Sequence, residues 1–349
     1  NYMKILITGG CGFIGSNFIH YLSSKDNIKI INIDNLTYAS NPSNLANFNE
    51  SDKYYFVEAD ICDYDKILSV ICKYSPDFLV NFAAESHVDR SIDDPNAFIY
   101  SNIIGTYNLL SASRAYLKNS NNHKFKFIHI STDEVFGSLG SSGFFSENSS
   151  YAPTSPYSAS KASSDHLAKA WFHTYDFPVI VSNCSNNYGP YQFPEKLIPL
   201  IIANCIDEKP LPIYGNGLNI RDWLYVEDHC DAIFKLLTNA SPGETYNIGG
   251  NNEKSNLEIV KTICRILDNK KPRKNNKLYE ELIDFVDDRP GHDYRYAIDS
   301  SKIKNDLGWI PNETFESGIK KTIDWYLNNE EWWRKIQQGI YSQERLGKL

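Results

Sequence analysis

The stretch "KILITGGCGFIG", residues 4–15, decides the fold. Its first half is a short apolar run typical of a buried strand, and Gly9, Gly12 and Gly15 follow where that strand would turn into a helix. Glycine permits a tight turn and lets a pyrophosphate approach the backbone, while the helix N-terminus offers free N–H groups. The spacing therefore predicts a strand–turn–helix unit that binds a dinucleotide.

A second dinucleotide signal is Asp34, at the end of the next apolar run. A carboxylate at this position accepts hydrogen bonds from ribose hydroxyls and repels a 2′-phosphate. No arginine stands beside it in "IDNLTY". The sequence therefore favours NAD over NADP as the cofactor.

Apolar runs and amphipathic stretches alternate along the first half of the chain. We expect strands at 4–8, 28–34, 54–60, 78–84, 126–131 and 179–183, and helices at 13–24 and 96–118. Several runs lack polar alternation, which fits strands buried on both faces. The alternation predicts an α/β fold, a doubly wound parallel sheet (Rossmann) with a second, smaller lobe. The expected NAD-binding domain is 1–183 with 221–254, and the expected lobe is 184–220 with 255–349.

Bulk composition excludes several classes of protein. The chain has 349 residues, 42% of them hydrophobic, which is enough for a sizeable core, and its net charge of −8 argues against nucleic acid as a partner. The seven cysteines are scattered without metal-binding spacing, so we expect reduced thiols, a cytoplasmic location and no metal site. We expect neither a membrane span nor a signal peptide, because no apolar run is long enough.

A candidate catalytic pair lies in "TSPYSASKAS", where Tyr157 and Lys161 stand four residues apart. Ser155 followed by Pro156 predicts a helix start, which would place both side chains on one face. An ammonium group near a phenol lowers the phenol's pKa and makes it a usable base.

Two adjacent carboxylates follow the strand in "HISTDEVFGS", residues 129–138. Asp133 and Glu134 come directly after Thr132, and like charges this close resist joint ionisation. They predict a general acid beside a general base, or else a turn cap facing solvent. Both can reach one site only if the strand ends at Thr132, because neighbouring side chains on a strand point to opposite faces.

Together these motifs resemble the extended short-chain dehydrogenase/reductase family. The resemblance covers nearly the whole chain and is sharpest to nucleotide-sugar 4,6-dehydratases that use a thymidine diphosphate sugar. It is carried by "AAESHVDRSI" (83–92), "ISTDEVFG" (130–137), "NCSNNYGPYQFPEKLIP" (183–199), "IRDWLYVEDH" (220–229), "YNIGGNNEKSNLEIV" (246–260) and "DRPGHDYRYAID" (288–299).

The resemblance implies a hydro-lyase reaction on dTDP-glucose. Tyr157 and Thr132 would serve oxidation at C4 with NAD as hydride acceptor. Glu134 would then remove the C5 proton and Asp133 would protonate the departing C6 hydroxyl, before hydride returns to C6. The product would be a 4-keto-6-deoxy sugar for deoxysugar (rhamnose) biosynthesis. The resemblance also implies a homodimer paired through helices at about 96–118 and 157–175.

The resemblance carries two sets of binding residues onto this chain. The NAD set is Gly9, Gly12, Phe13, Ile14, Gly15, Asp34, Asn35, Leu36, Thr37, Asp60, Ile61, Phe82, Ala83, Ala84, Ser101, Tyr157, Lys161 and Asn187. The nucleotide-sugar set is Ser86, Thr132, Asn186, Lys196, Leu197, Pro212, Tyr214, Arg221, Asn256, Arg289 and His292. Lys196, Arg221, Arg289 and His292 are the candidate cations for a pyrophosphate.

Three alternatives remain open. A UDP-glucose 4,6-dehydratase would share most of these motifs. A related epimerase or decarboxylase would share the glycines and the Tyr–Lys pair but not Asp133 with Glu134, because no water leaves. A dinucleotide-binding regulator without catalysis would need none of the four residues Tyr157, Lys161, Asp133 and Glu134. Three positions depart from the pattern: Cys11 for alanine, Ser101 for threonine and Phe136 for tyrosine.

Overall fold

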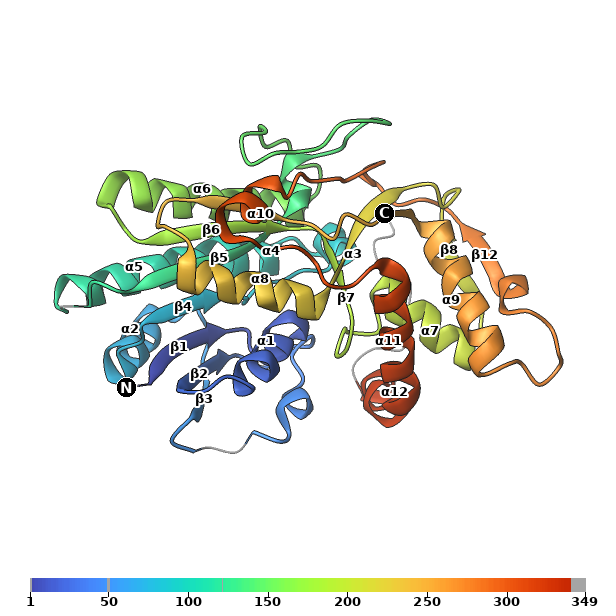
Figure 1. Ribbon diagram of the computed structural model, residues 1–349, viewed down its shortest axis with the longest axis horizontal. Coiled ribbons are helices and arrows are strands. Elements are labelled where there is room, and N and C mark those ends of the chain that lie inside the picture. Colours follow the sequence, from blue (N-terminus) through green and yellow to red (C-terminus); the bar gives the residue numbers. More distant parts are fainter. Residues whose placement is uncertain (1, 49–50, 121, 340–349) are drawn as a thin grey trace.

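A seven-stranded parallel sheet forms the centre of the molecule (Figure 1). The computed structural model describes residues 2–48, 51–120 and 122–339. The strand order is β10–β6–β5–β4–β1–β2–β3. The strands are β1 (Met3–Thr8), β2 (Ile28–Asp34), β3 (Tyr54–Glu58), β4 (Phe78–Asn81), β5 (Lys126–Thr132), β6 (Val179–Cys184) and β10 (Thr245–Ile248). The predicted doubly wound sheet is confirmed, and the order reverses between β1 and β4, where such sheets bind ligands.

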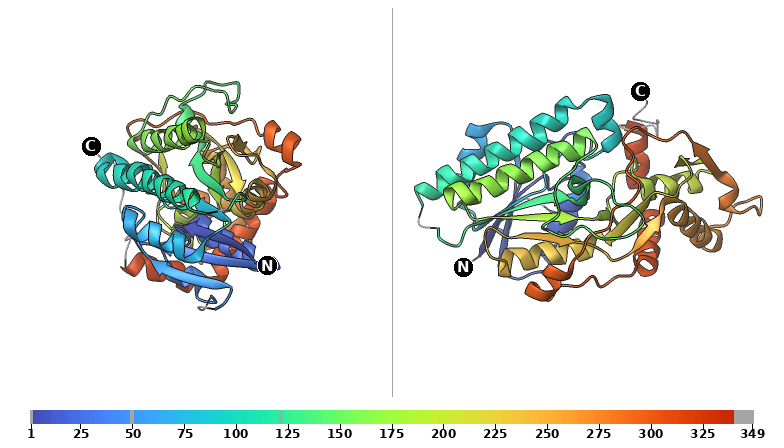
Figure 2. Two further views of the ribbon diagram at one scale, coloured as in Figure 1. Left: turned by 90° about the vertical axis from the view of Figure 1, so that its left-hand side faces the viewer. Right: turned by 90° about the horizontal axis from the view of Figure 1, so that it is seen from above.

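Helices cover both faces of this sheet. One face carries α1 (Phe13–Ser23), α8 (Val226–Asn239) and α10 (Ser301–Leu307), and the other carries α2 (Tyr64–Tyr74), α5 (Gly105–Lys118) and α6 (Pro156–Tyr175). Seen from above, α5 and α6 run side by side along the outside of the molecule (Figure 2). The central strands are buried on both sides, which explains why their sequences lack polar alternation.

The expected helix at 96–118 contains an irregular turn. It consists of α4 (Asn96–Phe98), a π-helical segment (Ile99–Ile104) and α5. Within that segment the Asn102 side chain accepts a hydrogen bond from Glu85 N and donates to Ser160 Oγ, both at 2.9 Å. Asn102 therefore fixes the loop after β4 against α6, where the pocket described below begins.

The second half of the chain adds a smaller lobe beyond one end of the sheet (Figure 1). Its elements are α7 (Leu197–Ile206), α9 (Asn256–Lys270), α11 (Phe315–Asn328), α12 (Glu330–Gly339) and the parallel pair β8 (Leu211–Tyr214) and β12 (Ile283–Val286). A three-stranded sheet of β7 (Asn186–Tyr188), β9 (Ile220–Tyr225) and β11 (Glu253–Ser255) adjoins it. The other short elements of the described ranges are 3₁₀ turns at Pro42–Leu45, Asp133–Phe136 and Tyr279–Leu282, and α3 (Val88–Asp93).

The predicted division into a domain of 1–183 with 221–254 and a lobe of 184–220 with 255–349 stays a prediction. Residues 340–349 of that lobe lie outside the described part of the chain. Ile303 of α10 and the nearby Trp309 pack into the core beside the large sheet. Across the described ranges, no helix combines the length and the apolar character that crossing a bilayer requires.

Candidate active site

The glycine-rich loop joins β1 to α1 as a tight turn, as predicted. Gly9 has φ +72°, and a Cβ there would lie 2.7 Å from Ala83 N. A Cβ on Gly15 would lie 2.3 Å from Gly9 O, so this helix start can approach the strand only without a side chain. The loop therefore leaves room and free N–H groups for a phosphate at the start of α1.

Asp34 stands buried at the end of β2 beside this loop. Its Oδ2 accepts from Cys11 N at 2.9 Å, and its Oδ1 accepts from Leu36 N at 2.9 Å and Ser40 Oγ at 2.7 Å. A carboxylate offers about four acceptor positions, so capacity remains for a ribose hydroxyl. These residues fit NAD, and the fixed negative charge disfavours a 2′-phosphate.

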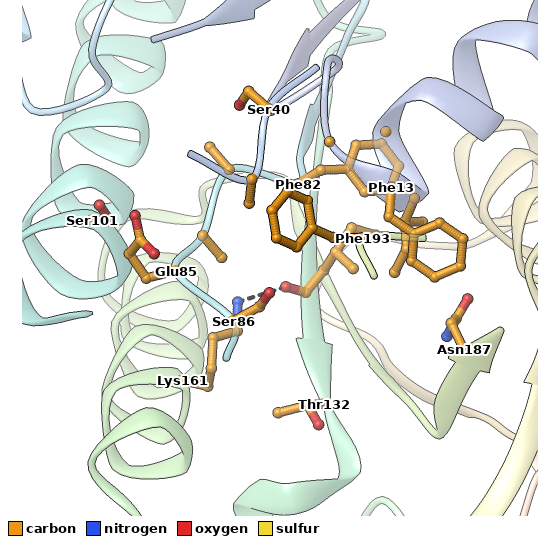
Figure 3. Close-up of a pocket in the computed structure, with 18 of the residues that line it drawn as sticks. Phe13, Ser40, Phe82, Glu85, Ser86, Ser101, Thr132, Lys161, Asn187 and Phe193 are labelled. Atoms are coloured by element: carbon orange, nitrogen blue, oxygen red, sulfur yellow. Dashed lines mark hydrogen bonds between the residues drawn. The ribbon is translucent and has the colours of Figure 1, made fainter. Parts of the chain in front are cut away.

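One pocket runs from the glycine loop to the end of β5. Figure 3 shows Phe13, Phe82 and Phe193 gathered on one side of it, with Thr132 and Lys161 at its other end. Of the predicted NAD set, every residue but Leu36 and Asp60 lines this pocket. Of the predicted nucleotide-sugar set, the pocket is lined by Ser86, Thr132, Asn186 and Lys196. The pocket thus brings the predicted NAD-binding residues together with the predicted catalytic residues.

Tyr157 and Lys161 lie on the first turns of α6. Ser155 caps this helix and Pro156 occupies its first position, as expected. Lys161 Nζ donates to Ile130 O at 2.8 Å. The expected lowering of the phenol pKa is not found: burial, and then the charge of Glu134, raise the pKa of Tyr157 well above its usual value.

Strand β5 ends just before Asp133, as it must if Asp133 and Glu134 are both to reach one site. β5 finishes at Thr132, and Asp133 and Glu134 form the next 3₁₀ turn, so both can approach one site. Burial, and then Glu134, raise the pKa of Asp133 well above its usual value. Burial also raises the pKa of Glu134, but Arg289, Arg221 and Lys196 oppose that rise. The surroundings therefore favour the protonated form more strongly at Asp133 than at Glu134.

The cations that oppose the rise at Glu134 come from the second half of the chain. Lys196 Nζ donates to Ser86 O at 2.9 Å, next to the pocket. Buried Arg221 donates to Asp293 O at 2.9 Å, and Arg289 pairs with Asp89 at 2.5 Å. Three of the four predicted pyrophosphate cations therefore surround one end of the site.

His292, the fourth predicted cation, is neutral near pH 7. Burial, followed by the charges of Arg289 and Arg221, lowers its pKa to about 4 despite its contact with Asp288 at 2.6 Å. His292 can therefore offer a hydrogen bond to a ligand but not a positive charge. Its ring lies edge-on to Tyr214, with centroids 6.0 Å apart.

The remaining predicted substrate residues lie on the lobe side, outside the pocket lining. Leu197 starts α7, Pro212 and Tyr214 lie on β8, and Asn256 starts α9. Asp89 was not among the predicted residues, yet its carboxylate accepts from Tyr214 OH at 2.8 Å and from Arg289. No local pattern marks Asp89, because its partners lie 125 and 200 residues away.

The three departures from the family pattern do not change the proposed acid, the proposed base or the Tyr–Lys pair. Phe136 is buried and packs against Phe145 and Tyr151, outside the pocket lining. Ser101 lines the pocket, and Cys11 contributes its backbone N–H to Asp34.

Comparison with known proteins agrees with this geometry. The family model described as GDP-mannose 4,6 dehydratase matches residues 6–322. A dTDP-glucose 4,6-dehydratase of Neisseria meningitidis serogroup B is 55% identical, over 99% of this chain and 99% of that protein. The crystal structure of a dTDP-glucose 4,6-dehydratase from Bacillus anthracis in complex with NAD superposes with a TM-score of 0.85 at 48% identity, covering 96% of this chain and 99% of that one.

A second solved structure extends the likeness to a nucleotide complex. The dTDP-glucose 4,6-dehydratase of Streptomyces venezuelae, with NAD and TYD bound, superposes with a TM-score of 0.88 at 40% identity, over 96% of this chain and all of that one. Family model, sequence identity and structural likeness all extend over nearly the whole chain. The chain belongs to the GDP-mannose 4,6 dehydratase family and, within it, to the dTDP-glucose 4,6-dehydratases.

Proposed function

We propose that this protein is an NAD-dependent dTDP-glucose 4,6-dehydratase that forms dTDP-4-keto-6-deoxy-glucose. The observation that carries the proposal is the pair Asp133 and Glu134 on the turn after β5, in the same pocket as Tyr157 and Lys161. Hydride transfer alone needs only a base such as Tyr157 and the lysine beside it. Asp133 and Glu134 are two further proton-transfer groups, which the loss of water requires.

The first half of the reaction oxidises the sugar at C4. The Tyr157 phenolate takes the C4 hydroxyl proton, and Thr132 Oγ hydrogen-bonds the same oxygen. Lys161 stabilises the phenolate by its charge. NAD supplies the hydride acceptor at C4 and later the donor at C6. The residues lining the glycine-loop end of the pocket are those that would hold it.

The second half removes water across C5 and C6. The C4 ketone acidifies the C5 proton, which Glu134 takes as base. Asp133, which burial keeps protonated, gives its proton to the departing C6 hydroxyl. When hydride returns to C6, protonated Glu134 gives a proton to C5 and is a carboxylate again. Tyr157 then holds the proton from the C4 hydroxyl and Asp133 lacks one, so proton exchange with solvent restores both before the next turnover.

Thymidine diphosphate is proposed over uridine diphosphate on the strength of the relatives, which are named for dTDP-glucose. Thymine and uracil differ by one methyl group, which is worth about 1–3 kcal/mol in an apolar pocket. The test is a side-by-side assay of dTDP-glucose and UDP-glucose that follows the 4-keto-6-deoxy product. We expect kcat/KM to favour dTDP-glucose at least about tenfold. Equal rates would leave the dehydration standing and overturn the choice of nucleotide.

We also propose that the protein is a homodimer paired through α5, α6 and the π-helical segment. Ile99, Tyr100, Ile104 and Tyr107 are between 40 and 55% exposed, although they are large and apolar. Tyr175 at the end of α6 is similarly exposed. An apolar patch of this kind on two adjacent helices is typical of a protein interface. A cytoplasmic location and a role in deoxysugar biosynthesis complete the proposal.

A further inference from the structure

A buried carboxylate lies behind the catalytic pair. Asp165 is fully buried on α6, one helical turn after Lys161, so both side chains lie on the same face of the helix. Its Oδ2 accepts hydrogen bonds from Ser131 Oγ at 2.8 Å, Tyr151 OH at 2.9 Å and Asn183 Nδ2 at 3.1 Å. These donors come from β5, β6 and the loop before α6, and they hold Asp165 as an anion.

The histidine beside Asp165 does not balance this charge. His129 Nε2 lies 3.2 Å from Asp165 Oδ1, and neither side chain is exposed. Burial, and then the charge of Lys161, lower the pKa of His129, so the ring is neutral near pH 7. Burial alone would raise the pKa of Asp165, but the contact with His129 and the charge of Lys161 hold it below its usual value.

Two lysines remain to compensate the anion. Lys169 is only partly buried and reaches Asp165 through the Tyr151 hydroxyl, to which its Nζ donates at 3.0 Å. Lys161 is buried and its ammonium group donates to a backbone carbonyl, Ile130 O. Among the residues that the structure describes, Lys161 is therefore the buried cation that compensates the charge of Asp165.

Asp165 is the group near Lys161 that carries a negative charge, whereas the neighbouring Cys184 and His129 are neutral. Burial lowers the pKa of Lys161, and Asp165 is the first group that opposes this effect. Cys184 on β6 also faces the lysine, but burial raises the pKa of its thiol to about 12, so it is uncharged. His129 on β5 is neutral as well. A buried cation is costly without a partner, and Asp165 fills that role without a direct contact.

The same carboxylate is linked to the strand end. Asn183 Nδ2 donates both to Asp165 Oδ2 and to Thr132 O, the latter at 3.0 Å. Ser131, another donor to Asp165, directly precedes Thr132. Asp165 thus holds the backbone that presents the Thr132 hydroxyl.

We propose that Asp165 is a positioning residue for C4 oxidation: its buried charge keeps Lys161 an ammonium ion beside Tyr157, and through Asn183 it fixes the end of β5. This inference rests on the proposed function, since it concerns the hydride-transfer half of that reaction. A purely structural role would let Asp165 be replaced by any group that keeps the hydrogen bonds. An electrostatic role requires its charge.

The first test compares Asp165→Asn with Tyr151→Phe. NADH formation is followed in a single turnover with dTDP-glucose across a range of pH, which isolates C4 oxidation from water loss. Removing the anion lowers the pKa of Lys161, so the alkaline limb of this profile should move to lower pH by about 1 unit or more. Tyr151→Phe removes one hydrogen bond to Asp165 but no charge, and its limb should stay in place.

An unshifted profile for Asp165→Asn, or an equal shift in Tyr151→Phe, would overturn the proposal. The wild-type chain in the same assay tests the proposed function separately, because it must form NADH and product whatever Asp165 does.

A second measurement covers the case in which Asp165→Asn folds poorly. Lys161→Met leaves the buried anion unbalanced, so adding Asp165→Asn to it should raise Tm by roughly 3 °C or more. A double variant no more stable than Lys161→Met would contradict the charge pairing.

Discussion

Asp133 and Glu134 are adjacent on one 3₁₀ turn, yet their surroundings differ: Asp133 is 1% exposed, whereas Glu134 is half-buried and three cations oppose the rise that burial causes in its pKa. Asp133 Oδ2 has no hydrogen-bond partner within the described part of the chain. Burial therefore favours the protonated form more strongly at Asp133. Such a divergence between paired carboxyls is how one site provides an acid and a base at the same pH.

The pH dependence of water loss follows from this difference. Asp133 acts in its protonated form, so elimination should be lost as pH rises through its raised pKa. Glu134 acts as a carboxylate, so elimination should be lost as pH falls through its own raised pKa. We expect a bell-shaped profile whose two limbs belong to the pair. In Asp133→Asn the alkaline limb due to Asp133 should disappear, and its persistence unchanged would contradict the acid assignment.

Solvent deuterium separates the acid from the base. With Asp133→Asn in D₂O, C4 oxidation and exchange of the C5 proton should continue while product formation slows by at least about 100-fold. With Glu134→Gln, C4 oxidation should continue but C5 should not exchange. Mass spectrometry of recovered sugar nucleotide gives the readout. Loss of C5 exchange in Asp133→Asn rather than in Glu134→Gln would reverse the two roles.

Tyr157→Phe should block the first step. The variant lacks the phenolic oxygen that takes the C4 proton, so NADH formation on mixing with dTDP-glucose should fall by at least about 100-fold. NAD binding should persist, because the pocket lining is otherwise unchanged. Binding of NAD, measured by calorimetry, is the control. Normal turnover by this variant would remove Tyr157 from the mechanism.

The proposed interface predicts the effect of a single surface charge. Ile104→Glu places a carboxylate in the apolar face of the π-helical segment, and sedimentation at micromolar concentration should then show monomer. Ile310→Glu is the matched control, because Ile310 is an exposed isoleucine of another segment and that variant should remain dimeric. A wild-type protein that is monomeric under these conditions would contradict the proposed dimer.

The sheet and the cofactor end of the pocket could be predicted because their signals are local. The glycine loop, Asp34 and the strand end at Thr132 each combine residues close in the chain. The pairing of Asp89 with Arg289 and Tyr214 could not be predicted, since it joins segments 125 and 200 residues apart. The neutral state of His292 also depends on burial, which its sequence neighbours do not reveal.

At the catalytic pair, too, the sequence predicts the positions of the residues but not the pKa of the tyrosine. The four-residue spacing of Tyr157 and Lys161 predicts their shared helix face. The rise in the pKa of Tyr157 depends on burial and on Glu134, which reaches the site from the turn after β5. Electrostatics at this site is thus a property of the assembled fold.

The central claim is that one hydride leaves C4 and returns to C6 of the same sugar. The most direct measurement uses dTDP-glucose carrying deuterium at C4, with NAD-loaded enzyme in ordinary water, and locates the label in the product by NMR and mass spectrometry. The account predicts a 4-keto-6-deoxy product with deuterium in its C6 methyl group. A product whose C6 methyl group lacks the label, or an epimer that retains its C6 hydroxyl, would contradict it.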